Sequence, residues 1–153
     1  KMAKNMQNTS YRKLDVDAFD PEQYDENDET VDTPGLGPDE RAVQGFLSSN
    51  RLEDALHASL LSPPLKTKDQ NVKDRATQLV TKVLQSFKNA EIEQTVQKLS
   101  IDEGDILMKY VYKAMELGAD AAVCQSLLAW HAQLVAKFGH GAIMRVFSGR
   151  QRL

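Results

Sequence analysis

The composition of this chain changes abruptly near Pro38. Residues 14–40 contain 11 acidic side chains and three prolines, but no lysine or arginine. Such a segment cannot bury enough apolar surface to offset the entropy that it loses on ordering, so by itself it should be disordered. We therefore predict two parts: an extended acidic tail over residues 1–38 that orders on a partner, and a helical body over residues 39–153.

Apolar side chains interrupt the acidic tail at nearly regular intervals. They are Leu14, Val16, Phe19, Tyr24 and Val31, and the basic pair Arg12 and Lys13 precedes them. Two interpretations are open. Many acidic tails only keep a protein soluble. An extended peptide that lies in the grooves of a partner would also carry apolar side chains at such intervals.

Beyond Pro38, apolar residues recur at steps of three and four, which is the period of an amphipathic helix. Capping-box spacings begin at Asn50 and at Thr67. Further candidate caps are Asn89 and Asp102, and Gly118 suits the end of a helix. The pattern predicts helices over 39–49, 50–62, 67–87 (the longest), 89–99, 102–117 and 120–138, and a last helix that holds residues 143–147.

These elements predict an all-α fold of about seven helices with short connections, because no run alternates as a strand would. The tight connection near Asn50 suggests a helical hairpin of the kind that stacks in an α–α superhelix. No repeat of about 34 residues follows, so a tetratricopeptide array is not predicted. A compact bundle is the alternative.

Composition limits the compartment and the partners. No apolar run reaches the roughly 20 residues that cross a bilayer, and the N-terminus is polar, so we expect neither a membrane span nor a secretory signal. The single Cys124 suits the reducing cytoplasm. Residues 1–40 carry a net charge of −7 and residues 41–153 one of +4, which lacks the dense basic stripe of a nucleic-acid binder.

We find no motif in the sequence that fits catalysis or metal binding. His57, His131 and His140 lie in different elements, without the spacing of metal ligands. Neither pair of nearby glycines, at 35–37 or at 139–141, follows a strand as a phosphate loop would. The Asp15–Asp17 start of a calcium loop lacks the later ligand and the turn glycine. We expect no cofactor, no metal and no catalytic residue.

The aromatic residues of the body offer two interpretations. Tyr110 and Trp130 fit the core, with Tyr112 on a flank of its helix. Alternatively, Lys109, Tyr112 and Lys113 face outward and meet a partner, since tyrosine is enriched at binding hot spots.

Several short runs together resemble one family, subunit 5 of the actin-related protein 2/3 complex. The resemblance spans nearly the whole chain in order. Its runs are Tyr11-Arg12-Lys13-Leu14-Asp15-Val16-Asp17, Asn71-Val72-Lys73-Asp74-Arg75-Ala76, Lys82-Val83-Leu84, Ser86-Phe87-Lys88, Glu91-Ile92-Glu93-Gln94-Thr95-Val96-Gln97, Asp105-Ile106-Leu107-Met108-Lys109-Tyr110-Val111-Tyr112-Lys113, Leu127-Leu128-Ala129-Trp130-His131 and Arg145-Val146-Phe147.

The resemblance implies a non-enzymatic structural subunit in the cytoplasm, at the actin cytoskeleton, that supports nucleation of branched actin filaments. Its body would dock on scaffold subunits and on the β-propeller subunit, and its tail would tether the actin-related protein 2 subunit. The filament would be contacted only indirectly, with no nucleic acid or membrane as partner. The implied tail contacts are Tyr11, Arg12, Lys13, Leu14, Asp15, Val16, Asp17, Phe19 and Tyr24, and the body contacts are Lys109, Tyr112, Lys113, Arg145 and Arg150.

Two other functions compete with this one. A free-standing helical adaptor that captures short peptides would be a stable monomer with an exposed groove. A small hydrolase or transferase would need convergent polar residues in a pocket, and the sequence offers no such set.

Overall fold

Seven helices and no strand make up the part of the chain that the computed structural model describes, residues 37–118, 120–149 and 151–153. The chain divides into two units, residues 1–30 and 31–153, and all described residues belong to the second. Its helices are α2 (Glu40–Ser48), α3 (Leu52–Leu60), α4 (Gln70–Gln85), α5 (Asn89–Lys98), α6 (Ile101–Glu116), α7 (Ala121–Phe138) and α8 (His140–Ser148). The prediction of an all-α fold is confirmed.

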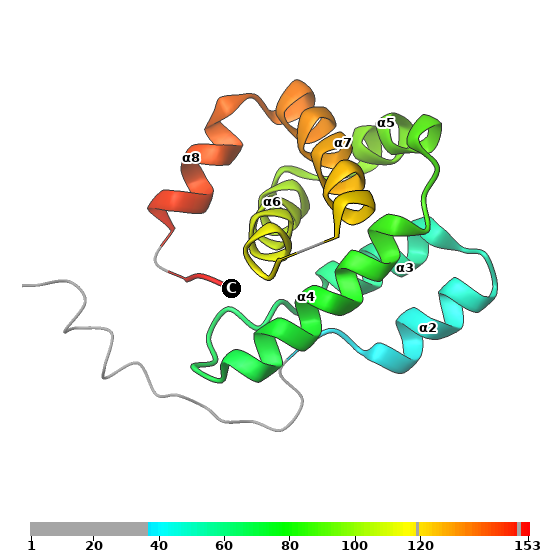
Figure 1. Cartoon of the computed structure of the whole chain (residues 1–153), viewed down its shortest axis with the longest axis horizontal. Coiled ribbons are helices and arrows are strands. Elements are labelled where there is room, and N and C mark those ends of the chain that lie inside the picture. Colours follow the sequence, from blue (N-terminus) through cyan, green and yellow to red (C-terminus); the bar gives the residue numbers. More distant parts are fainter. Residues whose placement is uncertain (1–36, 119, 150) are drawn as a thin grey trace, which may run out of the picture. The chain divides into compact units, whose positions relative to one another are not determined.

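Helix α6 lies in the middle of this unit. It contacts α3 and α4 on one side and α7 and α8 on the other, and α2 pairs with α3 at the periphery (Figure 1). Six of the residues of α6 are buried, among them Leu107, Met108 and Val111. Helices α3, α4, α7 and α8 thus pack around α6.

The core is built around two large aromatic side chains. Trp130 is fully buried; its indole N–H donates to the Leu84 carbonyl at 3.3 Å, and its ring meets Phe87 edge-on at 5.2 Å. These contacts fix the middle of α7 to the end of α4. Tyr110 is also buried, which raises the pKa of its phenol above the usual range. The interpretation of Tyr110 and Trp130 as core residues is confirmed.

The prediction that Asn50 caps the second helix is wrong, because Asn50 ends the first helix. It adopts φ 55° in the left-handed region, which asparagine tolerates better than most residues. The Asn50 N–H donates to the Leu47 carbonyl and the Arg51 N–H to the Phe46 carbonyl, at 3.1 and 2.9 Å. This pair of bonds is the Schellman motif.

Three other helix starts differ from the prediction. Helix α5 has its N-cap at Lys88, so Asn89 is its first helical residue rather than its cap. The carboxylate of Asp69, rather than the Thr67 hydroxyl, accepts the Asn71 N–H at 2.9 Å and starts α4. Ser100, rather than Asp102, caps α6, because only Ser100 is followed three residues later by a glutamate that can bond back. Helix α4, which was predicted to be the longest, has 16 residues and is shorter than α7 with 18. Helix α8 begins at His140, directly after Gly139.

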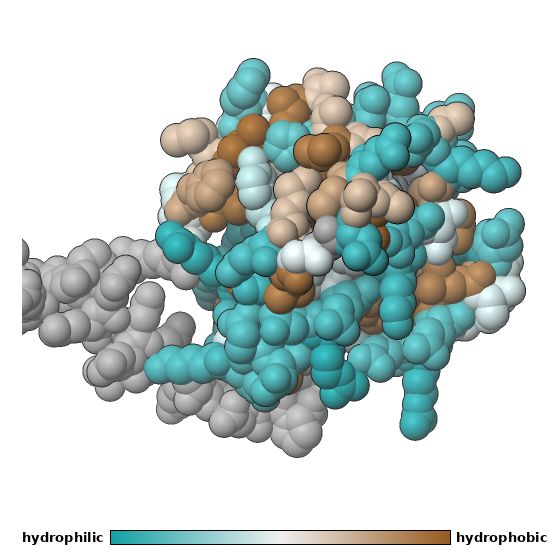
Figure 2. All heavy atoms as spheres, in the orientation of Figure 1, coloured by the Kyte–Doolittle hydropathy of each residue, from teal (hydrophilic) through white to brown (hydrophobic). Residues whose placement is uncertain are grey.

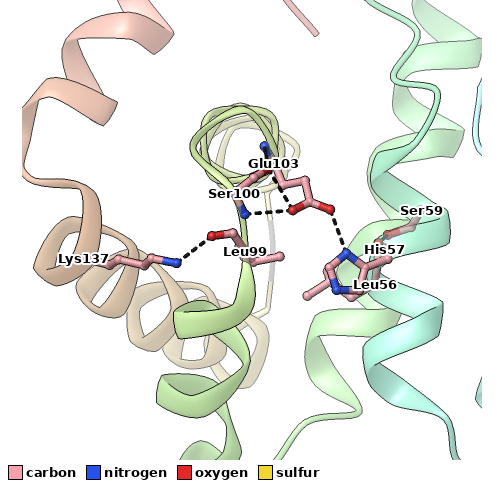
Figure 3. Close-up of polar contacts among 7 residues, drawn as sticks. All are labelled: Leu56, His57, Ser59, Leu99, Ser100, Glu103 and Lys137. Atoms are coloured by element: carbon pink, nitrogen blue, oxygen red, sulfur yellow. Dashed lines mark hydrogen bonds and ion pairs between the residues drawn. The ribbon is translucent and has the colours of Figure 1, made fainter.

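The joint between α5 and α6 is held from two sides (Figure 3). Glu103 accepts the Ser100 N–H at 2.8 Å and pairs with His57 Nδ1 of α3 at 2.7 Å. From the opposite side, the Lys137 ammonium of α7 donates to the carbonyls of Val96, Gln97 and Leu99, at 3.0, 2.9 and 2.5 Å. A cation at these carbonyls stabilises the end of α5.

Glycine at position 104 allows α7 to lie close to the first turns of α6. A Cβ added to Gly104 would lie 2.7 Å from Cζ and 2.9 Å from Cδ2 of Phe138, closer than real contacts allow. The Phe138 ring is in turn covered by the Lys137 ammonium, 4.8 Å from its centroid. The close approach therefore depends on the absence of a side chain at Gly104.

Gly104→Ala should destabilise the protein, by about 1–3 kcal/mol, because the Phe138 ring must move. Gly45 is the matched control, since it also lies inside a helix but a Cβ there would meet no atom within 4 Å. Gly45→Ala should stabilise by up to about 1 kcal/mol through helix propensity alone. Urea unfolding of both variants checks this, and the cost of Gly104→Ala should fall in a Phe138→Leu background. Equal stabilisation by both substitutions would contradict the close packing.

Glu103→Ala should lower the free energy of unfolding at pH 7 by about 1 kcal/mol, through loss of the capping box. Burial alone would raise the pKa of Glu103, but the bonds from the Ser100 backbone, from His57 and from the Ser100 hydroxyl together lower it. A carboxyl with a lowered pKa stabilises the fold above its unfolded pKa, and this contribution disappears as the pH falls through the folded pKa.

The difference in the free energy of unfolding between wild type and Glu103→Ala should therefore become smaller below about pH 4. Glu93→Ala, at an exposed position of α5, is the control with the same change of residue type. Denaturant unfolding between pH 7 and pH 3 measures the loss of stability for both variants. A loss for Glu103→Ala that does not change with pH would show that the bonds of Glu103 do not depend on the charge of its carboxylate.

Candidate partner-binding surfaces

The three histidines of the described residues lie in separate environments. His57 pairs with Glu103, His131 lies beside Tyr112, and His140 is exposed at the start of α8. Within residues 37–118, 120–149 and 151–153, no three His, Cys, Asp or Glu side chains are grouped so that they could hold a metal ion. The surfaces that stand out are suited to contacts with other molecules instead.

A pocket of about 240 Å³ lies between α6, α8 and the last residues of the chain. We call it the α6–α8 pocket. It is lined by Lys109, Tyr112, Lys113, Glu116, Val146, Phe147, Arg152 and Leu153. Three of the residues predicted to meet a partner, Lys109, Tyr112 and Lys113, thus lie together in its wall.

Tyr112 is one of the aromatic residues that line the α6–α8 pocket. It is half-buried, so it lies on the flank of α6 as the first interpretation of the aromatics expected. Its hydroxyl lies 3.2 Å from His131 Nε2, and its ring meets the Phe147 ring edge-on at 5.3 Å. Phe147 itself is 58% exposed. Two fixed aromatic rings therefore present an apolar surface to solvent.

Cations surround this aromatic surface. The Lys113 side chain is only 11% exposed and pairs with Glu116 at 3.2 Å. The ammonium of Lys109 donates to the Gln151 carbonyl at 2.8 Å, and that of Lys73 donates to the Arg152 carbonyl at 2.7 Å. Burial lowers the pKa of Lys73, and the nearby Lys113 charge lowers it further. Like charges are thus held close together beside the pocket.

The remaining predicted contacts are not part of the α6–α8 pocket. Arg145 of α8 also contacts α6, where its guanidinium forms two bonds with the Asp105 carboxylate, at 2.5 and 2.9 Å. Arg150 lies outside the described residues, as do the predicted tail contacts Tyr11, Arg12, Lys13, Leu14, Asp15, Val16, Asp17, Phe19 and Tyr24.

The outward side of α7 is a second surface, which the sequence reasoning missed. Its exposed positions carry no charge: Ala121, Ala122, Gln125, Leu128, Ala132 and Ala136. We call this surface the α7 face. Apolar residues gather over α7 and α8 in Figure 2, whereas the surface over α4 is mostly hydrophilic. A signal was present in the sequence, because Lys137 is the only lysine, arginine or acid between residues 121 and 138.

A surface helix of a globular protein usually carries charged side chains on its exposed side, and α7 lacks them there. Of the described helices, none is both long enough and apolar enough to cross a membrane. A large exposed apolar surface on a folded protein commonly marks a contact with another protein. The α7 face thus has the character of a protein interface.

Comparison with known proteins assigns the family. The family model described as ARP2/3 complex 16 kDa subunit (p16-Arc) matches residues 10–153. A protein of Caenorhabditis elegans named probable actin-related protein 2/3 complex subunit 5 is 51% identical over 148 residues, 97% of this chain and 100% of that protein.

Vertebrate proteins are also similar over their whole length. Actin-related protein 2/3 complex subunit 5-C of Xenopus laevis is 41% identical, with 98% of this chain and 99% of that protein covered. The human actin-related protein 2/3 complex subunit 5-like protein is 40% identical, with the same coverage. With both the family model and full-length relatives in agreement, the chain belongs to the family of the ARP2/3 complex 16 kDa subunit.

Proposed function

We propose that this protein is a non-enzymatic structural subunit of the actin-related protein 2/3 complex, located in the cytoplasm at the actin cytoskeleton. It supports nucleation of branched actin filaments by holding other subunits in position, and it contacts the filament only indirectly. The observation that carries this proposal is the full-length similarity to proteins named as subunit 5 of that complex.

The body, residues 39–153, docks on scaffold subunits and on the β-propeller subunit. Two surfaces support this role, the uncharged α7 face and the α6–α8 pocket with Lys109, Tyr112 and Lys113. Arg145 and Arg150 are further proposed contacts of the body, although Arg145 is already paired with Asp105. An obligate interface is typically apolar at its centre with charges at its rim, which matches this arrangement.

The tail, residues 1–38, tethers the actin-related protein 2 subunit. Its contacts are Tyr11 to Asp17 together with Phe19 and Tyr24. A tether works by raising the effective concentration of the subunit that it holds, so a weak grip by the tail can still strongly affect assembly. The alternative, a free-standing adaptor for short peptides, predicts a monomer that co-purifies with no other subunit.

Deletion of residues 3–38 should leave the body in the complex but loosen the actin-related protein 2 subunit by about tenfold or more, since tethering is lost. Complexes reconstituted with the full or the truncated chain, compared by subunit recovery and by actin nucleation, measure this. Normal nucleation and normal retention of that subunit by truncated complexes would contradict the tether.

Leu128→Asp should weaken incorporation of the subunit by about tenfold or more, because a charge would be buried in an apolar interface. Leu128 is 58% exposed, so the fold should be unaffected, as circular dichroism would verify. Gln78→Asp, at an exposed position of α4, is the control. Recovery of the complex on the tagged chain is the measurement, and equal recovery for both variants would exclude the α7 face as the interface.

A further inference from the structure

The α6–α8 pocket combines two kinds of wall. One wall is apolar, formed by the edge-on rings of Tyr112 and Phe147 together with Val146 and Leu153. The other wall carries the cations Lys109, Lys113 and Arg152, and the Lys73 ammonium is bonded to the backbone of Arg152. Apolar side chains next to charged ones are the usual parts of a site that takes one anchoring side chain of a peptide.

The cations at the pocket outnumber the nearby anions. Lys73 and Lys109 donate to backbone carbonyls, which carry no net charge, and Arg152 donates to the Phe147 carbonyl at 3.4 Å. Against these three cations and Lys113 stands Glu116, which pairs with Lys113. Glu116 is 70% exposed in its side chain, so solvent screens its charge while Lys113 is largely buried.

We infer that the α6–α8 pocket is a docking site for an acidic segment of a partner polypeptide that places one aromatic or large aliphatic side chain on Tyr112 and Phe147. Its carboxylates pair with Lys73, Lys109 and Arg152 around that side chain. The inference rests on the proposed function only in taking the partner to be another subunit of the complex.

The size and the chemistry of the pocket favour a peptide over other anions. Its volume of about 240 Å³ is below the roughly 300–1,000 Å³ of typical small-molecule sites, yet it suits a single large side chain. A nucleic-acid site would extend as a basic groove along the backbone of the ligand, whereas these cations surround an apolar surface. Carboxylates supply the complementary charge, and the aromatic wall supplies a place for the apolar side chain.

The test uses the full chain and a fluorescein-labelled peptide, Asp-Glu-Asp-Phe-Asp-Glu-Leu-Asp, with affinity measured by fluorescence anisotropy. We expect saturable binding that weakens as salt is raised. Phe147→Ala and Arg152→Glu should each weaken binding by about fivefold or more, the scale of one lost contact of about 1 kcal/mol. Met144→Ala, 66% exposed on α8 like Phe147, and Lys88→Glu, exposed at the N-cap of α5, should change the affinity less than twofold.

Two altered peptides separate the contribution of the acidic side chains from that of the apolar side chains. A peptide with asparagine and glutamine in place of the acids should lose binding, and so should a peptide with serine in place of Phe and Leu. Absence of binding up to about 1 mM would overturn the inference. Equal losses of affinity in Lys88→Glu and Arg152→Glu would also overturn it, because they would show that the peptide responds only to the net charge of the protein. Binding of vesicles containing an anionic phosphoinositide, without binding of the peptide, would assign the site to a membrane instead.

The peptide assay is independent of complex assembly. If peptide binding fails while the tagged chain still recovers the complex, only the inference about the pocket is wrong. If the chain recovers no other subunit but binds the peptide at the pocket, the proposed function is wrong and the peptide-binding adaptor gains support.

Discussion

The close packing of α7 on the start of α6 is the constraint from which the rest of the body follows. Phe138 rests on Gly104 where a side chain would clash, and the preceding Lys137 holds the carbonyls at the end of α5. The chain then turns at Gly139 with φ 71° and continues at once as α8. Helix α8 then returns along α6, and the α6–α8 pocket lies between the two helices.

This architecture separates stability from binding. The side of α7 that carries Leu127, Trp130 and Leu134 is buried in the core, whereas the α7 face is left uncharged and exposed. A single helix therefore both completes the core and presents a surface for a neighbour. In a subunit whose proposed task is to hold other subunits, such a helix couples a rigid position to an apolar interface.

Most of the fold was predictable, because helix periodicity is a local property of the sequence. The stripe that includes Leu79, Val83 and Leu84 is buried as expected, and Gly118 ends α6 with φ 79°. The helix starts were less accurate. Asn50 satisfies the spacing of a cap, but it also suits the left-handed position that closes α2, and the spacing alone does not distinguish the two roles.

The candidate surfaces were predicted in part. Tyr112 and its neighbouring lysines were identified from a short run on one helix, but the aromatic wall needs Phe147, which the chain brings back from α8. The α7 face was missed because the pattern over residues 120–138 was used only to predict a helix and the core residue Trp130. Sequence periodicity indicates which residues prefer burial, not whether the folded body has another element to cover them.

The sequence alone determined the helical class and the family, since these depend on composition, period and local motifs. Only the tertiary structure decided which surfaces remain open. Contacts such as Lys137 with the end of α5, His57 with Glu103 and Lys109 with the Gln151 carbonyl join residues about 40 positions apart. No local pattern encodes such pairs, because they form only when the packing of the helices has set the distances between them.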